Sequence, residues 1–389
     1  MPQIAGLRGL LPVVLPIVLP AAAAGETLDL AKAQADGTLV RDPTRAVYRY
    51  HQTFAGPGRT LTRKSLFCAV RLSPWSEGSI RPHEVAPSAR RDAALARIRA
   101  DGAHREPVLM GFRDPATEVE RLCRKAEGGR PTLEQTTTDG TLHKLWRISD
   151  AEAIGALRKY FAPKKLHVLE GHDRYEAQLA YHEEVTAKTA APMYSSANYG
   201  LACLTSLDDP ALAVTPRHRV IRGGAKREAV LGALGKLFII DKLPGSAKDI
   251  GKLFAALADS VAHQPTFVVV FAGEADAWKL TLSPEISPIA EGVAVHRALQ
   301  KLDPIAIQHL FIERALPQAQ VTTEIDAATA LAQLASGADV VVITRPVAVE
   351  QIAHVDELGG LLPAGSTAFH PPVAPGLVSL VIDPDEDLV

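Results

Sequence analysis

The stretch "KLHVLEGHDRYEAQLAYHEE", residues 165–184, decides the fold expected for this chain. "LHVLE" is an apolar run typical of a buried strand, Gly171 is a turn residue, and "DRYEAQLAYHEE" has the apolar spacing of a helix. A strand that turns through a glycine into a helix directs the first backbone N–H groups of that helix at the turn, where the helix dipole adds about half a positive charge. The stretch therefore predicts an α/β fold with an anion site at this corner.

Charged side chains surround the glycine of this corner. Glu170, at the strand end, could act as a base or a metal ligand, while His172 and Arg174 could donate hydrogen bonds to phosphate oxygens. A cation in the first helical turn works against the helix dipole, so a bound anion or a buried carboxylate should offset it. The alternative is purely structural: Asp173 and Glu176 form a capping box, Glu170 and Arg174 form a surface ion pair, and His172 is a turn residue.

The rest of the chain mixes strand and helix patterns, so the expected fold class is mixed α/β (α+β). Strand-like runs rich in β-branched or aromatic residues occupy 46–54, 65–72, 107–112, 142–148, 199–207, 218–221, 235–241, 266–273, 339–345 and 377–383. Helical patterns occupy 88–102, 149–161, 292–315, 325–336 and 347–357.

Two domains are expected, because 389 residues are too many for one ordinary core. The double glycine in "RVIRGGAKRE" (219–228) separates two regions that each have their own strands and helices. We therefore expect an N-terminal domain at 1–222 and a C-terminal α/β domain at 223–389.

Composition excludes several classes of protein. With 42 basic and 44 acidic residues the formal charge is -2, so no long-range field would hold a nucleic acid. The three cysteines, Cys68, Cys123 and Cys203, are far apart and show neither a disulfide framework nor zinc-site spacing. We assign no metal site and expect a reducing, cytoplasmic location.

The N-terminal run "MPQIAGLRGLLPVVLPIVLPAAAAGE" leaves two interpretations open. Arg8 followed by an apolar run and an alanine-rich end resembles a secretory signal. Pro12, Pro16 and Pro20 argue against it, because each removes a helix hydrogen bond and clashes with the preceding turn. No other run approaches the ~20 apolar residues of a membrane span, so no membrane is expected as a partner.

The corner stretch and five further segments in the same order resemble a bacterial family called domain of unknown function 1015. They are the corner stretch, which carries Asp-Gly-His-His-Arg-Tyr-Glu in that family, and "AGLRGLLP", "AVYRYHQTF", "SIRPHEVAPSARRD", "LDDPALAVTPRHRVI" and "LLPAGSTAFHPPVAPGL" around it. The resemblance implies site roles for His83, Glu84, His218, Arg219, Ser366 and Thr367. For "GSTAF" the structural alternative is that its hydroxyls bond their own backbone in a Pro-rich turn.

The family's corner loop in turn resembles the phosphate-binding loop of the ParB and sulfiredoxin superfamily, whose members include kinases of free serine. That likeness implies a ParB/sulfiredoxin-like N-terminal region and a small-molecule phosphotransferase, with a Mg-nucleotide as its cofactor. It concerns one loop, and a fold does not establish an activity.

Departures from the family pattern point to a weakened phosphate site. Asp173 stands where the family has a second histidine, and a carboxylate ~4 Å from a phosphate oxygen opposes it by about 4 kcal/mol before screening, at an effective dielectric near 20. Gly365 and Pro372 stand where the family's tail has lysines, and Glu170 replaces its aspartate.

Three functions follow as hypotheses. The favoured one is a relative that binds a small metabolite or a nucleotide at a degenerate phosphate site without efficient turnover. The alternative is a phosphotransferase of the free-serine-kinase type, with Glu170 as base or Mg²⁺ ligand, His172 and Arg174 on phosphate, and the other site residues as walls of a shared cleft. ParB-like DNA binding is disfavoured by the near-neutral charge.

Overall fold

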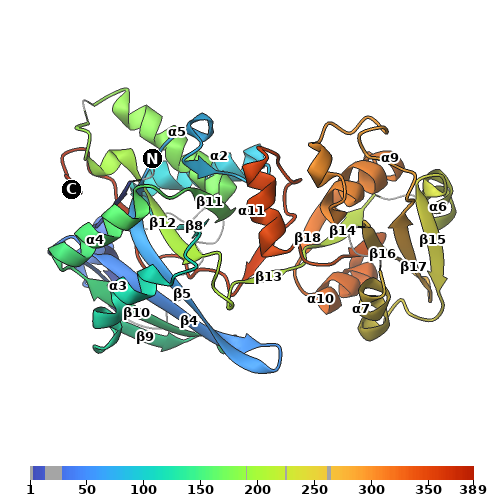
Figure 1. The fold of residues 1–389 in the computed structure, drawn as a ribbon, viewed down its shortest axis with the longest axis horizontal. Coiled ribbons are helices and arrows are strands. Elements are labelled where there is room, and N and C mark those ends of the chain that lie inside the picture. The colour runs from blue at the N-terminus through green and yellow to red at the C-terminus, as the bar shows by residue number, and fades with distance from the viewer. Residues whose placement is uncertain (1–2, 14–28, 190, 224–225, 261–263) are drawn as a thin grey trace. The chain divides into compact units, whose positions relative to one another are not determined.

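The computed structural model describes residues 3–13, 29–189, 191–223, 226–260 and 264–389. The chain divides into two compact units. The first comprises 1–82, 86–213 and 369–389, and the second comprises 83–85 and 214–368. Each unit combines strands and helices, which confirms the mixed α/β class (Figure 1).

The first unit is built on a nine-stranded sheet. Its order is β6 (Ile80–Arg81), β11 (Leu166–Glu170), β8 (Val108–Phe112), β12 (Tyr199–Ser206), β5 (Arg59–Arg71), β4 (Val47–Gly56), β10 (Leu142–Ile148) and β9 (Leu133–Thr136), and β1 (Ile4–Ala5) also pairs with β5. Most neighbours are antiparallel, but β12 runs parallel to β8 and β11 parallel to β6. Smaller pairs join β2 (Leu10–Pro12) to β3 (Leu39–Arg41) and β7 (Ala103–His104) to β21 (Leu380–Val381).

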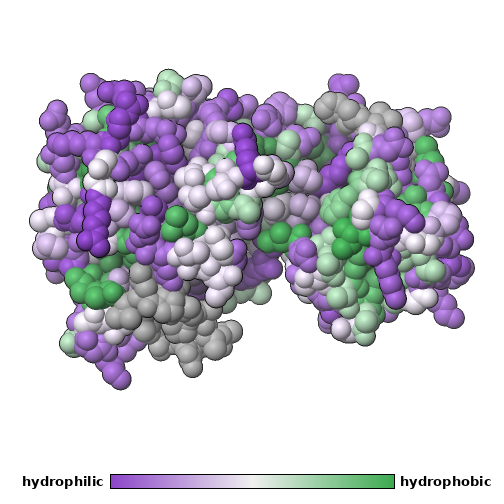
Figure 2. Space-filling view, turned by 90° about the horizontal axis from the view of Figure 1, so that it is seen from below, coloured by the Kyte–Doolittle hydropathy of each residue, from purple (hydrophilic) through white to green (hydrophobic). Residues whose placement is uncertain are grey.

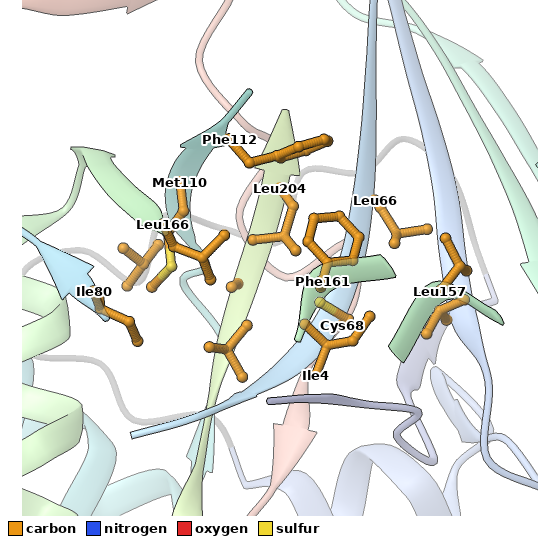
Figure 3. Packing of buried hydrophobic residues seen from close by; sticks show 14 of the residues in the cluster. Ile4, Leu66, Cys68, Ile80, Met110, Phe112, Leu157, Phe161, Leu166 and Leu204 are labelled. Carbon is orange, nitrogen blue, oxygen red and sulfur yellow. The ribbon is translucent and has the colours of Figure 1, made fainter. Parts of the chain in front are cut away.

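Alternation along β5 and β12 gives this sheet two different faces. Leu66, Cys68 and Leu204 point to one face, where Leu157 and Phe161 pack against the sheet (Figure 3). These last two residues lie on α4 (Ala151–Phe161), and α3 (Glu118–Glu127) adds Val119 to the same core. The other face carries the intervening residues, which include Arg63 and Ser65 of β5 and Thr205 of β12 along with apolar side chains.

Two further helices lie side by side at one edge of the first unit (Figure 1). They are α2 (Ser88–Asp101) and α5 (His172–Thr186), and they bury Ala94, Leu95 and Ile98 against Ala177. The short α1 (Leu30–Ala35) and the 3₁₀ turns η1 (Trp75–Glu77) and η2 (Ser196–Asn198) complete the unit.

The second unit contains a six-stranded sheet in which every pairing is antiparallel. Its order is β15 (Phe238–Leu243), β17 (Ala277–Leu282), β16 (Thr266–Phe271), β19 (Val340–Ile343), β14 (His218–Arg222) and β18 (Gln320–Glu324). The apolar run of β16 is explained by burial on both sides, because Phe267 and Val269 enter one core cluster while Val268 and Val270 enter another.

Helices cover both faces of the second sheet. Residues of α6 (Arg227–Leu234) and the π-helical turn η4 (Ala306–Ile312) enter the core cluster on one face, and residues of α7 (Ile250–Ala258) and α10 (Ala327–Ala332) enter the cluster on the other. The unit also contains η3 (Arg297–Leu299), α8 (Asp303–Ile305), α9 (Glu313–Ala315), η5 (Gln333–Ser336) and α11 (Val349–Glu357). A two-stranded sheet of β13 (Ala213–Thr215) and β20 (Ala368–His370) lies where the chain passes between the units.

The division of the chain differs from the expected boundary after residue 222. The first unit ends at Ala213, because β14 pairs with β18 and β19 of the second sheet. The C-terminal segment from Phe369 returns to the first unit, where β21 pairs with β7. The glycine at 223 therefore marks a turn within the second unit, and residues 224–225 lie outside the described residues.

Within the described ranges no helix is long and apolar enough to cross a membrane. Most of the apolar N-terminal run, residues 14–28, lies outside these ranges, so neither interpretation of it is tested. Figure 2 shows a face dominated by polar side chains, with apolar ones gathered on the part of the second unit that carries α7 and α10. Phe254 of α7 and Ile325, just before α10, are exposed apolar residues.

Candidate functional site

The predicted corner of strand, glycine and helix is confirmed. Strand β11 ends at Glu170 and α5 begins at His172, with Gly171 between them at a φ of 90°. This left-handed backbone is cheap only for glycine, which explains the residue type at the turn. The N–H of Tyr175 donates to the Gly171 carbonyl at 2.8 Å, so the helix is regular from its first turn.

Arg174 folds back over the corner instead of extending into solvent. A Cβ on Gly171 would come within 2.9 Å of the Arg174 Cζ, so the guanidinium covers the glycine backbone. Its Nη2 lies 4.0 Å from a Glu170 oxygen and its Nη1 lies 3.8 Å from Glu106, and both ion pairs are therefore loose. The Nε of Arg174 is buried and has no hydrogen-bond partner among the residues that the structure describes, which leaves the arginine with donor capacity at the corner.

Of the structural alternatives for this stretch, the capping box is absent and the surface ion pair is present. The N-cap of α5 is Gly171 and makes no side-chain cap, so Asp173 and Glu176 do not form a capping box. Glu176 instead accepts a hydrogen bond from the Trp75 indole at 3.4 Å. The surface pair of Glu170 and Arg174 exists, but at the limit of contact. His172 is buried at the start of the helix.

A second group of expected site residues meets inside the second unit. The isolated bridge between Glu84 and Leu362 places the His83–Glu84 pair beside the "GSTAF" turn, residues 365–369. Both acidic oxygens are engaged there: Glu84 Oε1 accepts the Thr367 N–H at 2.6 Å, and Oε2 accepts the Gly365 N–H at 2.9 Å. The Thr367 hydroxyl also donates to Glu84 Oε1. The backbone N–H groups of the turn thus bind a carboxylate of the protein itself.

His83 and Arg219 complete this internal carboxylate site. His83 Nε2 lies 2.9 Å from the Thr367 hydroxyl oxygen. Because this hydroxyl donates its own proton to Glu84, its oxygen accepts the hydrogen bond from the His83 Nε2–H. Arg219 Nη1 donates to the Gly365 carbonyl. Burial lowers the pKa of Arg219 to about 10, and the Glu84 charge opposes that shift, so the guanidinium stays protonated at neutral pH.

The remaining predicted residues take other positions. Ser366 donates to the Pro363 carbonyl at 2.6 Å, which is the structural alternative stated for a hydroxyl in this turn. His218 lies on the opposite face of β14 from Arg219, since successive strand residues alternate. Its ring is 6.0 Å from Phe254, its Nδ1 accepts the Thr344 N–H at 3.3 Å, and burial lowers its pKa to about 4. Neutral at pH 7, His218 adds no positive charge beside Arg219.

Two groups of residues therefore emerge, one in each unit. Glu170, His172 and Arg174 form the corner of the first unit, while the Glu84 site belongs to the second. A cleft shared by the two groups stays a prediction.

One residue that contacts this turn, Arg217, was not among the predicted site residues. Arg217 donates through Nε to the Thr367 carbonyl at 3.0 Å and through Nη1 to the Thr323 hydroxyl at 3.2 Å, and so fixes the turn from its other side. Its position next to His218, within the segment "LDDPALAVTPRHRVI", was the available signal.

Within the described part of the chain, no group of three or more His, Cys, Asp or Glu side chains could hold a metal ion by itself. A magnesium ion held by one carboxylate and by the phosphates of a ligand needs no such group. Glu170 fits that role, because its side chain is about one third exposed and its ion pair with Arg174 is loose, at 4.0 Å.

Comparison with known proteins gives one family match. The family described as protein of unknown function (DUF1015) matches residues 21–305. No curated protein matches the chain.

Several solved structures are similar to this one at low sequence identity. A free serine kinase in complex with AMP shares 13% identity over 84% of this chain and 93% of its own, with a TM-score of 0.42. A conserved hypothetical protein from Pyrococcus furiosus shares 12% over 80% and 92%, with a TM-score of 0.41. A C-terminally truncated SbnI from Staphylococcus aureus shares 12% over 82% and 90%, with a TM-score of 0.40.

Proposed function

The chain belongs to the family described as protein of unknown function (DUF1015), and on this premise we propose that it binds a phosphate-bearing small metabolite or nucleotide without efficient turnover. The ligand's phosphate would lie at the Gly171 corner, against the N-terminus of α5. Arg174 would turn from Gly171 to the phosphate oxygens, which satisfy its free Nε and offset its charge.

The proposal rests on the hydrogen bonds that hold the Glu84 carboxylate in place. Phosphoryl transfer to a hydroxyl needs a group that takes the hydroxyl proton, in addition to positioning and charge neutralisation. Glu84 accepts hydrogen bonds from the Gly365 and Thr367 N–H groups and from the Thr367 hydroxyl. Leaving these partners would strand two buried N–H donors at about 1–3 kcal/mol each. Glu84 therefore acts as a fixed structural anion and not as a mobile base.

Two features of the corner support binding. Gly171 has no side chain of its own, so once Arg174 turns away a ligand can approach the backbone at the helix N-terminus, a position that anions favour. Glu170 would hold Mg²⁺ together with phosphate oxygens, and the ion would neutralise part of the phosphate charge. Asp173, in the first turn of α5, opposes an anion and limits the affinity.

The second candidate function is a phosphotransferase that acts on a small hydroxyl compound such as free serine. The partial exposure of Glu170 favours it, because a carboxylate that is about one third exposed and bound to its arginine only at 4.0 Å is free to accept a proton. In that case Glu170 and not Glu84 would be the base, and His172 and Arg174 would hold the transferred phosphoryl group.

One pair of measurements separates the two functions. Thermal unfolding with ATP, ADP or pyrophosphate, each with and without Mg²⁺, should show stabilisation of about 2.7 kcal/mol at a hundred times the dissociation constant. Incubation of the same protein with L-serine and each donor should yield no phosphoserine above the enzyme-free rate. Turnover near the ~10 s⁻¹ typical of enzymes would support the phosphotransferase and contradict binding alone. The absence of any thermal shift would contradict both.

A further inference from the structure

A buried arginine in the first unit forms no ion pair with a described residue. Arg63 on β5 is fully buried, and its Nη2 donates to the Gln52 side-chain oxygen and to the Pro371 carbonyl, the latter at 2.6 Å. Both acceptors are neutral. Its Nε and Nη1 have no hydrogen-bond partner, and no carboxylate of a described residue forms an ion pair with it.

The ionisable groups close to this guanidinium are neutral at pH 7. Burial raises the pKa of the Cys203 thiol to about 12, raises that of the Tyr50 hydroxyl and lowers that of His143. Glu170 and Asp209 act on the arginine only through longer-range attraction. The charge of Arg63 is therefore uncompensated at short range.

A further donor lies on the same face of the sheet. Thr205 on β12 is directly opposite Ser65 on β5, and Ser65 is two residues from Arg63, so all three side chains point to one face. Thr205 is fully buried, and its hydroxyl has no partner among the described residues. This face is the one opposite the apolar core of Leu66 and Leu204.

The energetic cost of burying this arginine and this hydroxyl without partners indicates that the site lacks a ligand. A buried charge without a partner destabilises the folded state, and so does each buried donor without an acceptor. A water molecule could accept from an N–H group, but it leaves the charge uncompensated. An anion removes both penalties, because it accepts from the free N–H groups and the hydroxyl and neutralises the arginine.

We propose that Arg63 and Thr205 form a buried binding site for a small, singly charged anion, either a halide or a carboxylate. The site has one positive charge, which matches a monoanion. Gln52 and the backbone at 371–372 hold the Arg63 guanidinium in place, since Gln52 donates to the Pro372 carbonyl at 2.8 Å while accepting from Arg63, and Arg63 donates to the Pro371 carbonyl. Its donors, Arg63 and Thr205, differ from those of the proposed phosphate corner, because neither belongs to α5.

Thermal unfolding of the full-length protein in sodium salts at constant ionic strength tests this proposal. Chloride or formate, titrated against gluconate as a bulky anion of equal charge, should raise the Tm in a saturable way. Thr205→Val removes one donor with little change of shape, and should raise the half-saturating concentration about tenfold. Thr205→Ser keeps the hydroxyl and should retain the wild-type value. Whichever of chloride and formate saturates at the lower concentration identifies the halide or the carboxylate as the better ligand.

Three outcomes would overturn the site: equal stabilisation by gluconate, an unchanged half-saturation in Thr205→Val, or a saturable effect that persists in Arg63→Met. If Arg63→Met does not fold, the Thr205 pair decides the question alone. Arg174→Met separates this site from the proposed function, because it should abolish phosphate binding at the corner and leave the chloride or formate response unchanged.

Discussion

The backbone N–H of Thr367 donates a hydrogen bond to Glu84 Oε1 at 2.6 Å, although the two residues are 283 positions apart in the chain. The same carboxylate accepts the Gly365 N–H through its other oxygen. A turn able to bind an anion is thus occupied by a side chain of the protein. The proposed binding of a ligand without efficient turnover rests on this relationship.

Glu84→Gln should destabilise the protein by about 2 kcal/mol, because the amide NH₂ would face a backbone N–H that then has no acceptor. Urea unfolding measures the change. Glu118→Gln is the matched control, since Glu118 forms an exposed pair with Arg121 and its loss should cost less than about 0.5 kcal/mol. Equal effects of the two substitutions would show that Glu84 is not held as described.

Gly171→Ala should cost more than Gly102→Ala, although both glycines have a positive φ. At Gly102 a new Cβ meets nothing within 4 Å, so only the backbone strain of about 1–2 kcal/mol applies. At Gly171 the Cβ also displaces the Arg174 guanidinium. Unfolding free energies of the two variants give the comparison, and a smaller loss at Gly171 would mean that Arg174 does not cover it.

The corner was predictable from sequence because its elements are neighbours in the chain. A buried run, a glycine and a helical pattern fix "LEGHDR" within six residues, and the structure has strand, turn and helix at those positions. The occupation of the "GSTAF" turn was not predictable, because no local pattern tells which distant carboxylate will reach two backbone N–H groups. Such a contact is set by tertiary structure alone.

Asp173→His should strengthen the binding of ADP or pyrophosphate, because it removes a negative charge from the first turn of α5 and adds a donor. Calorimetric titration should show a gain of about tenfold at low salt that shrinks as the ionic strength rises. Glu183→Gln removes the same charge from an exposed position near the other end of the helix and should have little effect. An unchanged affinity in Asp173→His would place Asp173 away from the ligand.

His218 should make the stability of the second unit depend on pH. Its pKa is about 4 in the folded protein against an ordinary 6.5, so the unfolded state binds more protons between these values. Its contribution is therefore fully present above pH 6.5 and is lost as the pH falls toward 4, by up to about 3 kcal/mol. His218→Asn can still accept the Thr344 N–H and should flatten the calorimetric pH profile. His354→Asn, at an exposed site on α11, should not, and an unflattened profile in His218→Asn would refute the assignment.

Elsewhere, the strands predicted from the sequence coincide with observed strands. The predictions failed where a proline sets the start of a helix or where the outcome depends on which strands pair. The long helix expected at 292–315 begins only at Asp303, because Pro304 is tolerated in the first turn of a helix and not in its interior. Strand β17 was missed, and the boundary expected after residue 222 was displaced, since both depend on which strands pair within the second sheet.

Calorimetric titration of ADP with Mg²⁺ into the wild-type protein and into Arg174→Met tests the central claim most directly. The account predicts saturable binding to the wild type, a loss of at least tenfold in the variant, and no phosphoryl transfer to L-serine in the titrated sample. Equal binding to both proteins, or phosphoserine formed by the wild type, would contradict it.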